Sequence, residues 1–328
     1  MPLTTRLNCG HYKQLKKIIL ILTILGFTFQ LTASESISYF TTSDSIKIGY
    51  IQYGDESLPD LVFIHGGPGD NSSNFRNMGK LLSSHFRVTI FDSRGCGLST
   101  LNLNSDRLTI PDYVNDLKEL LDHLSIDQTV LLGHSFGGAI AIEFASVYPN
   151  RIEQLVLSNP LISSKWAQNN RFEESYKLAI EENDTSKINT YKKFKSNDSI
   201  SLWDEAKMLD ARLMWYNPDI IDSVFSYDYE SLGYTQEEFE SGFDIIISYY
   251  ETGFFPNYSV VDKLDQIKVK TSIISGSSDL IISESDLEDT CKSIPNCHIY
   301  RIDKSGHFPF LERPDEFKKT IITVCNKT

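Results

Sequence analysis

Ser135 is the central residue of the pattern Gly133-His-Ser-Phe-Gly137. An apolar run that begins at Thr129 leads into this pattern, and small apolar residues follow it at once. A strand that turns directly into a helix strains the backbone of the central residue and raises its Oγ above the edge of the sheet. Both flanking glycines are then needed, because a Cβ would collide with the neighbouring helix or strand. We therefore expect Ser135 to be a nucleophile rather than part of a structural glycine turn.

A second glycine-rich loop, His65-Gly-Gly-Pro-Gly69, follows the apolar run that begins at Leu61. In acyl-transfer sites of this kind, the oxyanion is held by the N–H of the residue after the nucleophile and by one N–H from such a loop. These positions belong to Phe136 and Gly67, and a glycine lets the backbone approach the substrate closely. The alternative is a plain turn at the end of a strand.

A nucleophilic serine needs a histidine base, and a carboxylate must orient that base. In this class the acid and then the histidine follow the nucleophile along the chain. Asp279 directly ends the apolar run 271–276, and His307 lies in a Gly-His pair after the run 298–303. The other six histidines lie in the N-terminal segment, beside the two motifs, or in helix or strand patterns: His11, His65, His85, His123, His134 and His298. The carboxylates that compete with Asp279 are Asp262, Asp265, Asp286 and Asp303.

Three motifs together resemble the proline iminopeptidase group of the α/β hydrolases, serine aminopeptidases that remove an N-terminal proline. They are His65-Gly-Gly-Pro-Gly69, Asp92-Ser-Arg-Gly-Cys-Gly-Leu-Ser99 and Gly133-His-Ser-Phe-Gly137, and the first is the most specific. The resemblance covers about residues 45–160 and 265–320. It implies an α/β-hydrolase fold and a Ser-His-Asp aminopeptidase. Some iminopeptidases bind the substrate amine with a glutamate directly after the triad aspartate, and Leu280 occupies that position here.

Other functions use the same triad. An esterase, a lactonase or a carbon–carbon bond hydrolase would act on an uncharged or acidic small molecule. A binding protein on a hydrolase scaffold would not need the complete triad. Epoxide hydrolase or haloalkane dehalogenase chemistry requires an aspartate at the position of Ser135.

The elements that must position these residues alternate along the chain. We expect strands at about residues 46–53, 61–65, 88–92, 129–134, 155–159, 271–276 and 298–303, and helices notably at 111–124 and 137–147. Strands that alternate with helices and carry active residues at their carboxyl ends are typical of an open, doubly wound and mostly parallel sheet. The α/β core is expected in two parts, residues 35–160 and 263–328.

Residues 161–262 break this alternation, and we expect them to form a helical cap over the sheet. They contain 19 of the 38 aromatic residues and 19 Asp and Glu against 9 Lys and Arg. A lid over a catalytic serine excludes water and selects the substrate. A carboxylate there would hold the cationic N-terminus of a peptide, and the candidates are Glu251 first, then Glu174 and Asp244. Acidic residues on lid helices are more often a solvated face.

Residues 1–34 have the pattern of a signal peptide, with three lysines before a twelve-residue apolar run from Ile18 to Phe29 and small residues near Ala33. This run is shorter than the ~20 residues of a spanning helix, although an uncleaved anchor is the alternative. We therefore expect a secreted or periplasmic enzyme whose mature chain begins near Ser34 or Glu35. N-terminal sequencing of the native protein tests this, and an intact leader would indicate anchoring instead.

Removal of residues 1–34 moves the net charge from −13 to −17, since the leader carries four basic and no acidic residues. Such an acidic surface argues against nucleic acid or an anionic membrane as a partner, and leaves a small molecule or short peptide as substrate.

Four cysteines remain, and pairing of Cys291 with Cys297 or with Cys325 stays open, while Cys96 is expected to be a free thiol. No Cys/His cluster or phosphate loop is evident, so we expect no metal or cofactor.

Overall fold

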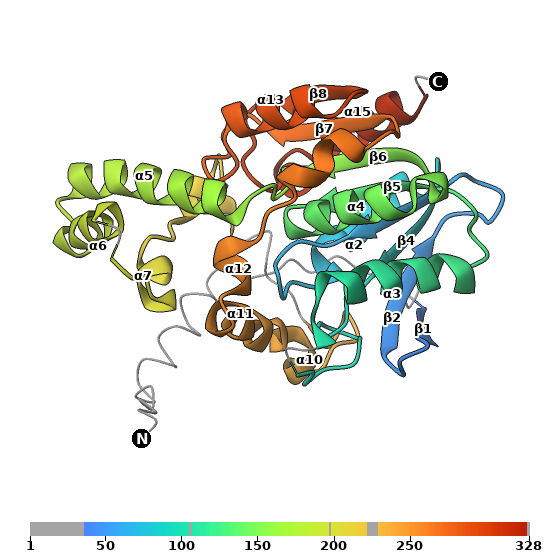
Figure 1. Cartoon of the computed structure of the whole chain (residues 1–328). Coiled ribbons are helices and arrows are strands. Elements are labelled where there is room, and N and C mark those ends of the chain that lie inside the picture. Colours follow the sequence, from blue (N-terminus) through green and yellow to red (C-terminus); the bar gives the residue numbers. More distant parts are fainter. Residues whose placement is uncertain (1–35, 105–106, 197, 222–228, 327–328) are drawn as a thin grey trace.

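An eight-stranded sheet forms the centre of the protein in the computed structural model, which describes residues 36–104, 107–196, 198–221 and 229–326 (Figure 1). Its strand order is β1-β2-β4-β3-β5-β6-β7-β8. β1 and β2 pair antiparallel, as do β2 and β4, and the remaining pairs are parallel. The strands are β1 Ile37–Thr41, β2 Lys47–Tyr53, β3 Asp60–Ile64, β4 Arg87–Phe91, β5 Thr129–His134, β6 Ile152–Ser158, β7 Thr271–Gly276 and β8 Cys297–Ile302.

Helices cover both faces of this sheet because side chains along a strand alternate between its faces. Within β3, Val62 and Ile64 join the hydrophobic core under α3, α4 and α13, whereas Leu61 and Phe63 join a second core under α2 and α15. The helices are α2 Arg76–Leu82, α3 Ile110–His123, α4 Phe136–Val147, α13 Glu284–Ser293, α14 Pro309–Glu312 and α15 Pro314–Asn326. The expected doubly wound α/β fold is confirmed.

The strand expected at each apolar run is present, with ends that differ by up to three residues. β1 was not predicted. It is a short edge strand with only Phe40 buried, so it lacks the alternation that marks a half-buried strand. The expected leader, residues 1–34, lies outside the described residues. Among the residues that are described, no helix is long and apolar enough to cross a membrane.

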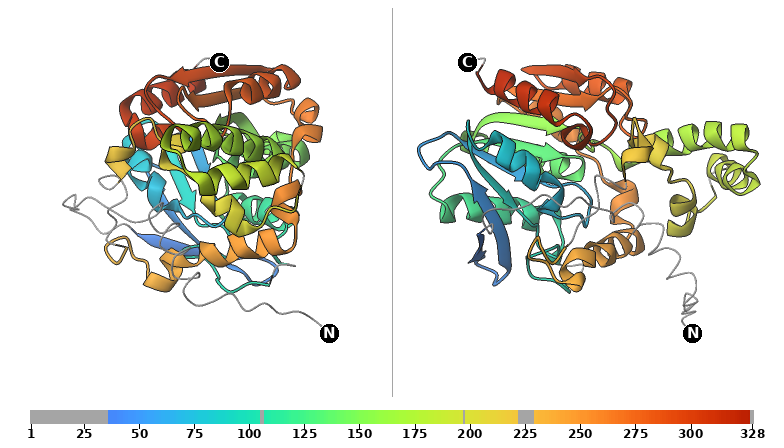
Figure 2. Two further views of the ribbon diagram at one scale, coloured as in Figure 1. Left: turned by 90° about the vertical axis from the view of Figure 1, so that its left-hand side faces the viewer. Right: turned by 180° about the vertical axis from the view of Figure 1, so that it is seen from behind.

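The segment between β6 and β7 is helical wherever it has regular structure within the described ranges. Figures 1 and 2 show α5 and α6 extending away from the sheet as a pair. The two ends of the segment between β6 and β7 pair with each other. Ser164 N donates to Tyr258 O at 2.9 Å, and Val260 N donates to Ile162 O at 2.9 Å. The helices are α5 Ser164–Glu182, α6 Thr185–Lys195, α7 Leu202–Lys207, α8 Ala211–Met214, α10 Gln236–Glu240, α11 Gly242–Glu251 and α12 Phe254–Asn257. We call this segment the cap.

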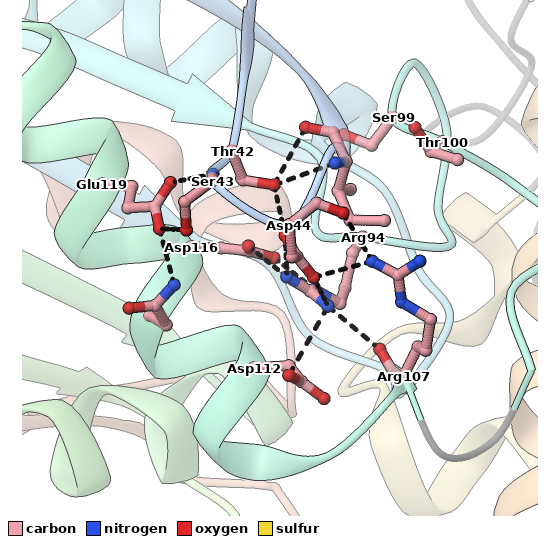
Figure 3. Close-up of polar contacts among 12 residues, drawn as sticks. Thr42, Ser43, Asp44, Arg94, Ser99, Thr100, Arg107, Asp112, Asp116 and Glu119 are labelled. Atoms are coloured by element: carbon pink, nitrogen blue, oxygen red, sulfur yellow. Dashed lines mark hydrogen bonds and ion pairs between the residues drawn. The ribbon is translucent and has the colours of Figure 1, made fainter.

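The turn after β4 is held by a buried arginine (Figure 3). Arg94 is 1% exposed, and its Nε and Nη2 each donate to the Asp116 carboxylate of α3 at 2.6 Å. Its Nη1 also donates to Asp44, in the turn between β1 and β2, at 3.1 Å. Removal of one partner from such a buried pair costs about 3–5 kcal/mol. The motif Asp92–Ser99 is thus an anchor between the sheet, α3 and the first hairpin.

A disulfide joins Cys291 at the end of α13 to Cys297 at the start of β8. The sequence left two disulfides open, Cys291–Cys297 and Cys291–Cys325, and the structure contains the first. Cys96 is buried with a free thiol, and Cys325 is half-buried and free.

Candidate active site

Ser135 lies in the sharp turn between β5 and α4, with φ 51° and ψ −118°. A side chain at positive φ is strained, and here close packing imposes the conformation. A Cβ at Gly133 would lie 2.4 Å from Gly137 O, and a Cβ at Gly137 would lie 2.3 Å from Ile64 O. Ser135 itself is only half-buried within this tightly packed turn, and it lines a cavity.

His307 and Asp279 form a buried pair at the neighbouring strand ends. His307 Nδ1 lies 2.6 Å from Asp279 Oδ2, and the two residues are 4% and 6% exposed. This contact places a proton on Nδ1 and leaves Nε2 as the base. The other carboxylate oxygen, Oδ1, accepts from the backbone N–H groups of Ile281 at 2.9 Å and Ile282 at 3.1 Å.

Asn159, which was not predicted from the sequence, also contacts this pair. Its Nδ2 donates to Asp279 Oδ2 at 2.7 Å, so that the oxygen facing His307 is held from two sides. The signal was its place directly after β6, at the same sheet edge as Ser135 and Asp279. Of the competing carboxylates, Asp286 bonds Ser283 at the start of α13, and Asp303 is exposed.

His134, the residue before Ser135, packs against His307. Its ring centroid lies 4.9 Å from that of His307, and its Nδ1 lies 3.1 Å from Ser158 O. Burial, together with the nearby His307, lowers the pKa of His134 well below its usual value. A neutral His134 does not oppose the positive charge that His307 gains as a base.

The predicted oxyanion donors, Phe136 and Gly67, belong to the two loops beside the cavity at Ser135. Phe136 is the first residue of α4, where backbone N–H groups have no partner within the helix and the helix dipole favours negative charge. Gly67 has φ 116°, and it lines the same cavity as Ser135 and His307. The loop is fixed by His65, whose Nε2 accepts from Ser93 N at 3.0 Å.

The cavity at Ser135 has a volume of about 160 Å³ and is roofed by the cap. Core residues supply its floor, including Gly67, Ser135 and His307. Cap residues supply the rest of the wall: Ser164, Ala167, Gln168 and Arg171 of α5, Glu205 of α7, and Leu209, Met214, Tyr250, Phe255 and Pro256. A cavity of this size accommodates one small group beside the serine.

A charged pair lies in the cap wall of this cavity. Glu205, 4% exposed, forms an ion pair with Arg171 and accepts a hydrogen bond from Gln168 Nε2. The Nε–H of Arg171 is buried without a hydrogen-bond partner among the described residues. Neither residue was predicted from the sequence, because no local pattern separates Glu205 from the other acidic residues of the cap.

The three cap carboxylates that were selected lie elsewhere. Glu251 is exposed at the end of α11, because the neighbouring Tyr250 faces the cavity and adjacent helical residues point in different directions. Glu174 bonds Lys177 on the outer side of α5 at 2.7 Å. Asp244 is exposed and lines a separate cavity with Glu237 and Glu240. The cap carboxylate that lines the cavity at Ser135 is Glu205, and these three do not line it.

No group of three or more His, Cys, Asp or Glu side chains is placed to hold a metal ion in the part of the chain that the structure describes. The predicted triad and oxyanion residues, together with Asn159, lie at the carboxyl ends of β3, β5, β6, β7 and β8.

Comparisons with known proteins support the fold described above. A profile of the family described as alpha/beta hydrolase fold matches residues 59–314. A proline iminopeptidase of Clostridioides difficile (strain 630) is 28% identical over 278 residues, 83% of this chain and 91% of that protein. One of Arabidopsis thaliana is 25% identical, over 81% of this chain and 73% of that protein. The proline iminopeptidase-related protein from Thermus thermophilus superposes with a TM-score of 0.69 at 23% identity, covering 89% of this chain and 97% of that structure. The chain belongs to the α/β-hydrolase family and resembles its proline iminopeptidases.

Proposed function

We propose that the protein is a serine hydrolase that works through an acyl-enzyme, with Ser135 as nucleophile, His307 as base and Asp279 as the residue that orients the base. The observation that carries the proposal is the 2.6 Å contact between His307 and Asp279, with His307 and Ser135 in the wall of one cavity. Attack by Oγ on a carbonyl carbon transfers the serine proton to His307 Nε2. The N–H groups of Phe136 and Gly67 stabilise the oxyanion, and the loss of one such donor typically costs ~100- to 1000-fold in kcat.

The substrate that we propose is a peptide or amide with a free N-terminal proline or another small residue. Support comes from the curated proline iminopeptidase relatives. The cavity volume of about 160 Å³ suits one residue beside Ser135. Glu205 supplies a carboxylate in the same wall, and a carboxylate binds an ammonium group by charge-assisted hydrogen bonds. We also propose that the enzyme is exported, on the leader pattern of residues 1–34.

A second candidate is a small neutral or acidic ester or lactone. The observation that favours it is the ion pair between Glu205 and Arg171. Arg171 balances the negative charge of Glu205, so an ammonium group gains less from that carboxylate than from an unpaired one. The unpartnered Nε–H of Arg171 would instead suit a carbonyl or carboxylate oxygen of the substrate.

Parallel turnover of a prolyl anilide and a short-chain nitrophenyl ester separates the two candidates. An aminopeptidase should cleave the anilide. Glu205→Gln should then raise the KM for the anilide by the factor that corresponds to one lost hydrogen bond to a charged group, ~1.5–3 kcal/mol. The same variant should leave the neutral ester nearly unaffected. Glu174→Gln is the matched control, because it removes the same charge from the outer side of α5, and it should change neither substrate.

Because Glu205→Gln removes the charge opposite Arg171, the thermal unfolding of the variant is recorded beside its kinetics. Equal effects on both substrates would remove Glu205 from amine binding. If the wild type cleaves no free-amine substrate but does cleave the ester, the aminopeptidase proposal is wrong and the second candidate stands.

A further inference from the structure

The cap contacts both loops that carry the proposed acid and base. Leu213 O, at the end of α8, accepts from the N–H of Leu280, the residue after Asp279, at 2.9 Å. Met214 O accepts from the N–H of His307 itself at 2.6 Å. These are backbone contacts, so they fix the path of the two loops rather than one rotamer.

The close approach at Met214 depends on Gly306, the residue before His307. A Cβ at Gly306 would lie 2.1 Å from Met214 O and 2.9 Å from Trp215 Cα. Trp215 is 3% exposed and stacks on Phe308, with ring centroids 4.8 Å apart. The cap segment 213–217 is therefore packed against the His307 loop on both sides of the histidine.

A single carboxylate joins these two pieces of chain. Glu312, at the end of α14, accepts at Oε2 from the N–H of Gly306 at 2.5 Å. Its Oε1 accepts from the N–H groups of Tyr216 at 2.9 Å and Asn217 at 3.2 Å. Burial raises the pKa of the Glu312 carboxyl, and these three N–H groups oppose that rise by favouring the charged form.

We propose that Glu312 is a positioning residue that clamps the cap segment 213–217 to the His307 loop, so that the imidazole is aligned with Ser135 only while the cap is seated. The proposal rests on the assignment of Ser135, His307 and Asp279 made above. A clamp of this kind couples the part of the protein that selects the substrate to the base that activates the nucleophile. The hydrogen bonds of Glu312 are with the backbone N–H groups of Gly306, Tyr216 and Asn217, so it acts on His307 through the backbone.

The variant Glu312→Gln tests this role because it is close to isosteric. A carboxylate accepts hydrogen bonds at both oxygens, whereas an amide has one accepting oxygen and places N–H groups against a backbone donor. Either Gly306 or the pair Tyr216 and Asn217 then loses its acceptor. Glu316→Gln on α15 is the matched control, since Glu316 is 45% exposed, pairs with Arg313 and carries the same charge.

The measurement is kcat per active site, counted by labelling to completion with a fluorophosphonate. The probe forms a bond from phosphorus to Ser135 Oγ and releases fluoride, with the serine proton passing to His307. We expect Glu312→Gln to keep the labelled fraction of the wild type but to lose about 10- to 100-fold in kcat per labelled site, with little change in KM. Glu316→Gln should keep the wild-type kcat.

A merely structural role would lower the labelled fraction or the melting temperature and leave kcat per labelled site unchanged, and that result overturns the proposal. If Glu312→Gln yields no folded protein, Tyr216→Pro decides, because it removes one N–H donor from the cap side and leaves Glu312 in place. Trp215 is extended, with φ −122° and ψ 133°, as a residue before proline must be. The kcat per labelled site of Tyr216→Pro should also fall, and an unchanged value overturns the proposal that Glu312 clamps the cap to the His307 loop. Failure of the probe to label Ser135 in the wild type would instead overturn the proposed function.

Discussion

Ser135→Ala should lower kcat by about 10⁴-fold or more on any substrate that the wild type hydrolyses, because no other group can form the acyl-enzyme. The fold should survive. Alanine removes only the hydroxyl, and Ser135 already adopts the φ of 51° that the turn requires. The measurement is kcat with an ester or anilide substrate, together with the loss of fluorophosphonate labelling by mass spectrometry.

Ser164→Ala is the control for this result. Ser164 lines the same cavity and is 4% exposed, so the substitution removes a second hydroxyl from the site without touching the turn at Ser135. Its kcat should stay near the wild-type value. Substantial turnover by Ser135→Ala would show that the nucleophile is misassigned.

Asp279→Asn should reduce kcat by about 10⁴-fold while His307 stays in place. The amide group would donate a hydrogen bond toward His307 Nδ1, which then becomes the unprotonated nitrogen. The proton would move to Nε2, the atom that must accept the proton of Ser135. Thermal unfolding and kcat are measured on the same preparation.

Asp286→Asn and Asp303→Asn serve as comparisons, since both aspartates competed with Asp279 in the sequence. Asp286 bonds Ser283 and Asn170, and Asp303 is exposed, so neither variant should lose activity to a comparable degree. Near wild-type activity in Asp279→Asn would exclude Asp279 as the residue that orients the base.

The sequence predicted the sheet and the residues at its edge because the two are linked by local rules. Apolar runs marked the strands, and the carboxyl ends of parallel strands lie together at one edge. Ser135, Asp279 and His307 each follow such a run within a few residues, so their proximity needed no knowledge of long-range packing. β1 was missed since an edge strand with one buried side chain has no periodic pattern.

The cap could not be predicted in the same way. Which of its carboxylates faces the cavity depends on how α5, α7 and α11 pack against one another, and a helix with acidic residues on several faces gives no local signal. Glu251 was chosen for its aromatic neighbours, but Tyr250 takes the inward position and Glu251 points outward. The role proposed for Glu312 was not predictable from the sequence either. Its hydrogen-bond donors are the N–H groups of Gly306, 6 residues away, and of Tyr216 and Asn217, about 95 residues away.

The pairing between the two ends of the cap allows the cap to change in evolution independently of the sheet. Because Ile162 and Ser164 bond Val260 and Tyr258, the cap leaves and rejoins the sheet through one short stem, in which the two segments are joined by a single β-bridge. Evolution can therefore lengthen, shorten or exchange what lies beyond that stem while the strand ends that hold Ser135 remain undisturbed. The segment 213–217 sets the limit on such exchange: a replacement cap would have to present backbone groups at the same places to the loops of Asp279 and His307.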